Sequence, residues 1–164
     1  MKRLPKSKGC NKSMIESFMR EALKMAHKSL DYDEVPVGAI VVRDNKIIGR
    51  GYNQPILNHD PTCHAEIMAM RDAGQKLKNY RLTECDLYVT LEPCVMCLGA
   101  IFHARIKNLF FAAHDLKTGA CGSMINLAAD STINHHCDYQ GGLLAEESIH
   151  LLQNFFKSKR QKKP

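Results

Sequence analysis

The sequence lacks any long apolar run, and no segment approaches the roughly 18 consecutive apolar residues that a membrane-spanning helix needs. Its basic N-terminal stretch is not followed by an apolar segment, so we expect no secretory signal, no membrane partner and a cytoplasmic location. Internal repeats are also missing. With 164 residues, of which 45% are hydrophobic, the chain suits one domain and is too apolar to be disordered.

Acidic residues are missing from both ends of the chain. Residues 1–12 hold five basic groups and residues 157–164 hold five more, with no acid in either segment. Residues 13–156 carry 13 basic groups against 17 acidic ones, so the net charge of +6 comes from the ends. Such clusters are typical of proteins that bind nucleic acid. Solvated tails that only aid solubility are an equal alternative. We expect basic tails at 1–12 and 161–164 around a single domain at 13–160.

The cysteines do not suit a disulfide framework, because their number is odd and their spacing is uneven. In the reducing compartment that we expect, metal binding or catalysis is the first function to consider for them. The seven are Cys10, Cys63, Cys85, Cys94, Cys97, Cys121 and Cys137.

Apolar periodicity and turn residues predict an α/β domain with a mixed sheet. Helices are expected at 13–30, from Cys94 to His103 and at 143–159. A further helix is expected to begin after a cap at Asp60, with Pro61 in its first turn. Strands are expected at 37–42, 46–52, 86–91 and 106–112, with a weaker segment near 134–138. The segment 53–61 is expected to be a loop.

Two short segments carry the chemistry. They are His64-Ala65-Glu66 and Pro93-Cys94-Val95-Met96-Cys97, and each lies at a predicted helix start. Cys94 and Cys97 are three residues apart, so on a helix their sulfurs share one face. In the first turn, the helix dipole favours thiolate over thiol. Together with His64 they offer two sulfurs and one nitrogen, which leaves the fourth position of a tetrahedral zinc site for water.

Glu66 is predicted to act beside the metal and not as a ligand. It is two residues from His64, which places it about 200° around an ideal helix. A carboxylate there can accept a proton from a metal-bound water, whose pKa Zn²⁺ lowers toward about 7.

Each segment alone is a weak indication, since a lone C-x-x-C is more often a structural zinc corner or an incidental pair. Together they match H-x-E…P-C-x-x-C, the pattern of zinc-dependent nucleobase deaminases. A fourth ligand from Cys85, Cys121 or Cys137 would instead close the site and make the zinc structural. Cys63, directly before His64, is expected to be a small buried residue.

The chain resembles the bacterial tRNA-specific adenosine deaminases, within the cytidine deaminase-like superfamily. The resemblance extends from about Met14 to Arg160. Beyond the zinc pattern it rests on the segments Asp33–Ala39, Asn53–Pro55, His59–Thr62, Leu91–Cys97, Asp115–Ala120 and Phe155–Phe156. His114 and Gln54 stand where relatives often have Arg.

The resemblance implies a three-layer α/β/α sandwich around a five-stranded mixed sheet, in a homodimer. It implies one Zn²⁺ per subunit, held by His64, Cys94 and Cys97, with Glu66 as the proton shuttle. The reaction would be hydrolytic deamination of adenosine to inosine at wobble position 34 of a tRNA anticodon stem-loop, with an arginine tRNA as the implied substrate. The implied substrate contacts are Asn53, Leu91, Asp115, Lys117 and Phe156.

Other functions fit parts of the pattern. A deaminase of free bases or nucleosides would need no RNA surface, a zinc-stabilised RNA-binding module would need no catalysis, and a redox pair of Cys94 and Cys97 would need no zinc. The last helix adds two expectations. One of Phe155 and Phe156 should pack in the core, and the basic residues Lys157, Lys159 and Arg160 should meet RNA phosphate.

Overall fold

Residues 12–161, the part of the chain that the computed structural model describes, form one sheet with helices around it. In chain order the elements are α1 (Lys12–Leu30), β1 (Gly38–Arg43), β2 (Lys46–Tyr52), α2 (Pro55–Asn58), α3 (Ala65–Leu77), β3 (Asp86–Leu91), α4 (Val95–Ala104), β4 (Asn108–Ala113), a 3₁₀ turn (Leu127–Ala129), β5 (Asp138–Gln140) and α5 (Ala145–Gln161). The predicted tails lie outside the described residues, except that Lys12 and Gln161 are the end residues of α1 and α5.

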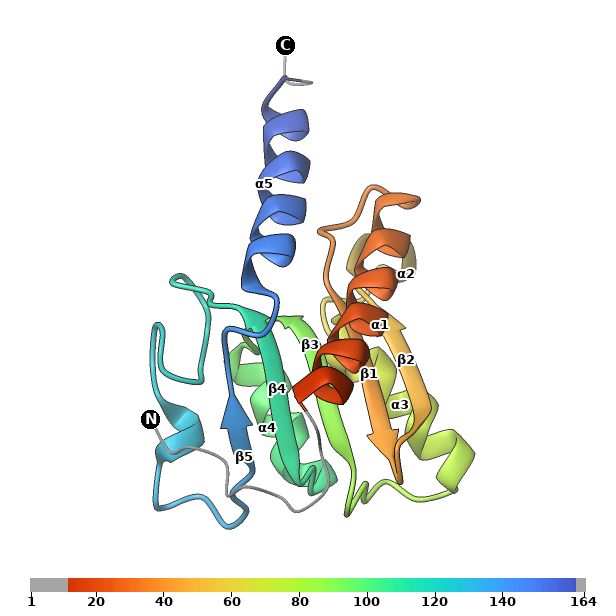
Figure 1. Cartoon of the computed structure of the whole chain (residues 1–164), viewed down its shortest axis with the longest axis vertical. Coiled ribbons are helices and arrows are strands. Elements are labelled where there is room, and N and C mark those ends of the chain that lie inside the picture. Colours follow the sequence, from red (N-terminus) through yellow and green to blue (C-terminus); the bar gives the residue numbers. More distant parts are fainter. Residues whose placement is uncertain (1–11, 162–164) are drawn as a thin grey trace.

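The sheet has five strands in the order β2-β1-β3-β4-β5 (Figure 1). β1 runs antiparallel to β2 and β3, whereas β3, β4 and β5 run parallel to one another. The antiparallel part is the predicted hairpin, whose turn residues Asp44 and Asn45 both have positive φ, as the twist of a tight hairpin requires. The parallel part needs a crossover, which α4 supplies between β3 and β4. The expected mixed sheet is confirmed.

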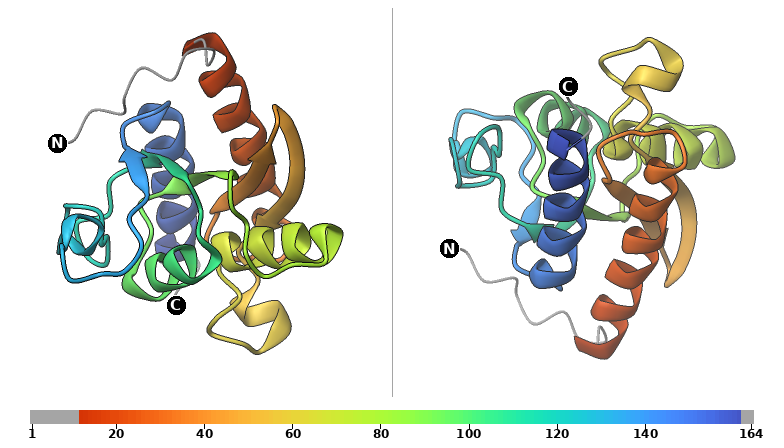
Figure 2. Two further views of the ribbon diagram at one scale, coloured as in Figure 1. Left: turned by 90° about the horizontal axis from the view of Figure 1, so that it is seen from below. Right: turned by 90° about the horizontal axis from the view of Figure 1, so that it is seen from above.

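Helices cover both faces of this sheet, which confirms the three layers (Figure 2). On one face, the apolar sides of α3 and α4 bury Leu98, Ile101 and Phe111 in the larger core. On the other, α1 buries Met19 against Tyr88, whose ring stacks on its neighbour in β4, Phe110, at 4.6 Å. α5 begins on the α1 side and continues past the edge of the sheet (Figure 1). Within residues 12–161 no helix is long and apolar enough to cross a membrane.

The start of α3 differs from the prediction. The helix begins at Ala65 with His64 as its N-cap, so the predicted cap at Asp60 is wrong. Asp60 Oδ1 instead accepts hydrogen bonds from the backbone N–H and the hydroxyl of Thr62, at 2.8 and 2.7 Å. A short polar side chain that bonds its own turn is not available to cap a helix four residues further on.

The segment predicted as a loop contains the short helix α2. Pro55 fits the first helical position, where its missing N–H costs no hydrogen bond. The buried carboxylate of Glu34, from the turn after α1, accepts hydrogen bonds from the N–H groups of Ile56 and Leu57 at 2.7 and 2.9 Å. This cap comes from a distant segment, so local sequence could not reveal it.

Strand β5 begins where its predicted range ends, since it spans Asp138–Gln140 and not 134–138. Two of its three side chains are exposed and the third is half-buried, so it has no apolar alternation to detect. Its pairing with β4, in which Asn108 faces Asp138, creates the strand.

Candidate active site

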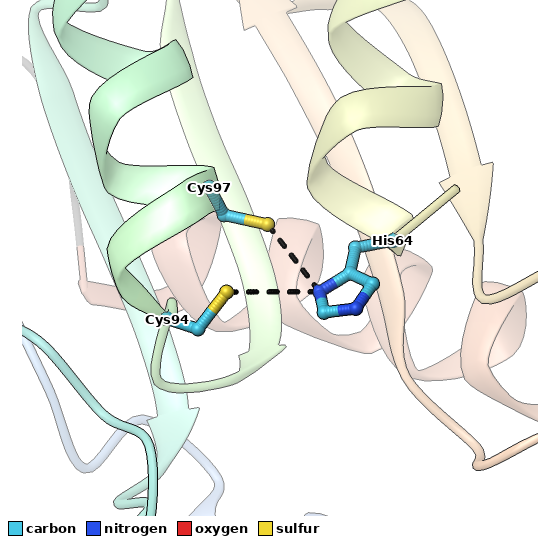
Figure 3. A group of neighbouring side chains, drawn as sticks. All are labelled: His64, Cys94 and Cys97. Atoms are coloured by element: carbon cyan, nitrogen blue, oxygen red, sulfur yellow. Dashed lines mark hydrogen bonds between the residues drawn. The ribbon is translucent and has the colours of Figure 1, made fainter. Parts of the chain in front are cut away.

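The candidate metal ligands lie where α3 and α4 begin (Figure 3). His64 is the N-cap of α3, Cys94 is the N-cap of α4, and Cys97 lies in the first turn of α4. Both N-cap residues have extended backbone, with φ of −72° and −76°, and neither side chain caps its own helix. The imidazole and the two thiols therefore turn toward one another (Figure 3).

The distances within this group fit zinc. His64 Nδ1 lies 3.7 Å from Cys94 Sγ and 3.5 Å from Cys97 Sγ. Zinc bonds of about 2.3 Å to sulfur and 2.0 Å to nitrogen, at tetrahedral angles, separate the two ligand atoms by about 3.5 Å. Among residues 12–161 no other His, Cys, Asp or Glu joins the group, so these residues supply three ligands and not the four of a closed structural site.

The pKa shifts within the group also favour metal binding. A hydrogen bond from the Cys97 thiol lowers the pKa of Cys94 to about 4, against the effect of burial, and the same bond raises the pKa of Cys97. The hydrogen bond to Cys94 raises the pKa of His64. A lowered pKa at Cys94 favours the thiolate form that binds zinc, and metal binding at Cys97 requires release of its thiol proton.

Glu66 lies beside the three ligand residues in the first turn of α3 and is only 4% exposed. Burial raises its pKa to about 7, and the nearby His64 ring and Cys97 thiol partly oppose that effect. A carboxyl group with a pKa near neutrality suits a residue that takes up and returns a proton. Its carboxylate is not part of the ligand cluster.

Asn53 fixes the beginning of α3. Its Oδ1 accepts a hydrogen bond from the N–H of Ala65 at 3.0 Å, so it caps the helix whose N-cap side chain faces the metal site. The close approach of α3 to β2 requires Gly51, because a Cβ there would lie 2.3 Å from the carbonyl oxygen of Ala65. These contacts set the position of His64 in the fold.

A groove of about 520 Å³ lies between the segment after β4 and α5, and it contains two of the predicted RNA contacts, Lys117 and Phe156. Phe156 is 47% exposed, whereas Phe155 is 8% exposed and packs inward, as expected for this pair. The other lining residues are Ala113, His114, Ile149, Leu152, Gln153, Lys159 and Arg160. Of the remaining predicted contacts, Leu91 is half-buried at the end of β3 and does not line this groove.

The basic residues at the end of α5 are not equivalent. Arg160 is exposed on the wall of the groove, and Lys157 is exposed but does not line it. Lys159 forms an ion pair with Asp33, and its Nζ lies 5.3 Å from the centroid of the Phe155 ring. Lys159 therefore ties α5 to the turn after α1.

Asp115, a predicted substrate contact, uses its carboxylate within its own turn. Oδ1 accepts a hydrogen bond from the Lys117 N–H at 2.9 Å, and Oδ2 accepts one from the Thr118 hydroxyl at 2.6 Å. The Asp115 N–H donates to Glu92 at 3.1 Å. Sequence patterns assign no role to Glu92, but its carboxylate is buried and accepts hydrogen bonds from the segment 114–123.

The other described cysteines lie outside the metal cluster. Burial raises the pKa of Cys85 to about 11 and that of Cys137 to about 12, so these thiols stay protonated. Cys63 is buried beside Asp60, with its Sγ 3.4 Å from the carboxylate.

Comparison with known proteins shows which family the chain resembles. Residues 12–113 match the cytidine and deoxycytidylate deaminase zinc-binding region. The chain is 49% identical over 149 residues to the tRNA-specific adenosine deaminase of Haemophilus influenzae, covering 90% of this chain and 86% of that protein. It is 42% identical over 146 residues to the enzyme of the same name from Streptococcus pyogenes, covering 89% and 92%.

A solved structure from studies of A-to-I editing by tRNA:A34 deaminases at the wobble position of transfer RNA superposes with a TM-score of 0.80. The identity is 43%, over 83% of this chain and 99% of that one. Because the zinc-binding region, the fold and the identity over nearly the whole length agree, the chain belongs to the tRNA-specific adenosine deaminase family of zinc-binding deaminases.

Proposed function

We propose that this protein converts adenosine 34 to inosine in a tRNA anticodon, with one Zn²⁺ per subunit and an arginine tRNA as the substrate. The observation that carries the proposal is the buried Glu66 beside a three-residue zinc site. The relatives' names and identities support the substrate class.

The chemistry divides between the metal and Glu66. When bound by His64, Cys94 and Cys97, zinc supplies a Lewis acid that makes water a stronger nucleophile. Glu66 accepts a proton from the attacking water and delivers it to N1 of adenine, then moves a second proton to the departing amino group at C6. Adenosine and water thus become inosine and ammonia, and Glu66 ends in the state in which it began.

Asn53 and Leu91 flank the position of the base in this proposal. Since Asn53 Oδ1 is held by the Ala65 N–H, its amide nitrogen is the group that can donate to the base. The half-buried Leu91 offers an apolar contact at the end of β3. An anticodon loop suits such a site because its bases are unpaired and can leave the stack at low cost.

The groove beside α5 is the proposed path of the RNA. Phe156 offers an exposed ring on which a base can stack, and Lys117 and Arg160 offer cations to phosphate. Asp115 is expected to contact the nucleotide only through the turn that it shapes, because its carboxylate is already bonded.

We also propose a homodimer of single-domain subunits (residues 13–160) in the cytoplasm. An open groove of about 680 Å³ between α3 and α4 is lined by Ile67 and the 70% exposed Tyr80, a surface that a second copy could cover. Light scattering should then give about twice the 18.5 kDa of the chain.

The test of function compares substrates. The purified zinc-loaded protein should produce inosine from an anticodon stem-loop with A34, and should not deaminate free adenosine, guanine or cytosine at a comparable rate. Activity on the free compounds alone would reject the tRNA proposal. In cells depleted of the protein, tRNA sequencing should find A in place of inosine at position 34, and the affected tRNA identifies the natural substrate.

A further inference from the structure

Glu92 is a buried carboxylate that none of the chemistry above uses. It is 2% exposed and lies between strand β3 and the zinc ligand Cys94. Burying a charge without partners is costly, so its presence calls for a set of matching donors. Those donors come from one segment, residues 114–123, which also forms part of the groove.

Five donors surround the carboxylate. Oε1 accepts hydrogen bonds from the N–H groups of Cys121 and Ser123, at 2.8 and 3.1 Å. Oε2 accepts them from the Asp115 N–H at 3.1 Å, from His114 Nδ1 at 3.3 Å and from the Ser123 hydroxyl. Three of the five donors are backbone N–H groups, which can only donate, so both Glu92 oxygens act as acceptors, as those of a carboxylate do.

The same segment is fastened to the metal-ligand turn through its backbone. Ala120 donates its N–H to the carbonyl of Pro93 at 2.9 Å, and Gly119 forms a β-bridge with Cys94. Gly119 has to lack a side chain, because a Cβ there would lie 2.5 Å from Glu92 Cδ. Glu92 thus packs between the zinc ligand and the segment that carries Lys117.

The network also fixes which ring nitrogen of His114 carries a proton. A carboxylate cannot donate, so the proton on the nitrogen facing Glu92 must belong to His114 Nδ1. The Ser123 oxygen, 3.2 Å from the same nitrogen, is compatible with that assignment. The ring is held at right angles to Phe111 and half-exposed in the groove, which leaves Nε2 as the nitrogen available to a ligand.

We propose that Glu92 is a positioning residue, which holds segment 114–123 beside the zinc ligands and orients His114 so that Nε2 contacts the ribose–phosphate backbone of the bound RNA. This inference rests on the proposed function for the identity of the ligand. Glu92 itself touches neither metal nor RNA, and its effect is on the affinity of the groove for RNA.

Glu92→Gln tests the inference with almost no change in size. Either orientation of the new amide places an NH₂ group against two donors: the Asp115 N–H and His114 Nδ1 in one, the Cys121 and Ser123 N–H groups in the other. We expect the KM for the anticodon stem-loop to rise at least tenfold, kcat to change less than threefold, and zinc content to stay at the wild-type level.

Hydrogen exchange provides a readout that does not need activity. In Glu92→Gln, the amides of Asp115, Cys121 and Ser123 should exchange at least tenfold faster, whereas amides of α3 should not change. Glu84→Gln is the matched control, because Glu84 is exposed, pairs with Lys107 and lies before β3, at the opposite end of that strand from Glu92. It should leave KM, kcat and exchange unchanged.

Two further variants keep the test open if Glu92→Gln does not fold. Ser123→Ala removes one donor and should raise KM about two- to fivefold. His114→Ala should raise KM a similar amount in the wild type and less in the Ser123→Ala background. A fall in kcat with unchanged KM, or unchanged exchange in the segment, would overturn the positioning role. Absence of inosine with the wild-type protein would instead reject the proposed function.

Discussion

The metal site and the groove beside α5 are built in different ways. His64 and Cys94 are fixed by the backbone, since each is the N-cap of a helix that packs on the sheet. The groove depends on side chains: Lys117 lies in a segment held by Glu92, and α5 is tied to the turn after α1 through Lys159 and Asp33. The backbone at a packed helix start holds a side chain in one place. A loop held by separate side-chain hydrogen bonds can lose these contacts one at a time. We therefore expect changes at the metal site to abolish the reaction and changes at the groove to alter RNA affinity in steps.

The largest effect should come from removing the metal. Dialysis against a strong chelator, or the Cys97→Ala variant, should reduce inosine formation to background, because both the nucleophile and its orientation are lost. Zn²⁺ should restore the chelated wild type but not the variant. Metal analysis and the stem-loop assay check this. A carefully purified protein that contains no zinc would instead favour the hypothesis that Cys94 and Cys97 are a redox pair.

Glu66→Gln should come next. Loss of the proton shuttle is expected to lower kcat by about 10²–10⁴-fold, while zinc content and stem-loop affinity remain close to wild type, because Glu66 is not among the metal ligands. Glu147→Gln, an exposed carboxylate on α5, serves as the control. If the variant kept its rate of inosine formation, Glu66 would have no catalytic role.

The neighbouring residues Phe155 and Phe156 test whether the groove can be altered without disturbing the fold. Phe156→Ala should leave the thermal midpoint unchanged and weaken stem-loop binding by about 1–3 kcal/mol, the value of one stacked base. Phe155→Ala should lower the free energy of unfolding by about 3–5 kcal/mol, since its ring is buried. Equal loss of stability in both variants would contradict the separation between a core ring and an RNA-facing ring.

The smallest effects should come from single charges. Lys117→Ala and Arg160→Ala should each reduce the dependence of log Kd on log salt by about 0.7–0.9, as expected for one phosphate contact. Removing residues 1–12 should cost less affinity than neutralising Lys157, Lys159 and Arg160 together. The opposite ranking would move the main RNA contact to the other end of the chain.

Sequence patterns predicted much of the fold because most of its elements are amphipathic and local. The first helix, the hairpin and strand β3 were expected within one residue of their bounds in the structure. Strand β5 escaped because it exists through its pairing with β4, and the start of α3 escaped because Asn53 replaces the expected cap from twelve residues away.

The candidate site shows the same division. The spacing of Cys94 and Cys97 and the pattern around His64 predict three candidate zinc ligands, and the structure brings these three residues together. Glu92 could not be recognised in this way, because its partners lie 22 to 31 residues further along the chain. The available signal in the sequence was a glutamate between a buried strand and a proline. Only the tertiary contacts show what this glutamate binds.

Asn53 has a consequence for attempts to redesign this enzyme. The side-chain oxygen of Asn53 accepts the hydrogen bond of the first N–H of α3, and the nitrogen of the same amide is the donor proposed for the base. The same residue is therefore expected to affect both the preference for a nucleobase and the placement of His64. A variant selected for a different nucleobase at this position would loosen the metal site at the same time, so an altered specificity should arise more readily from neighbouring positions such as Leu91 than from Asn53 itself.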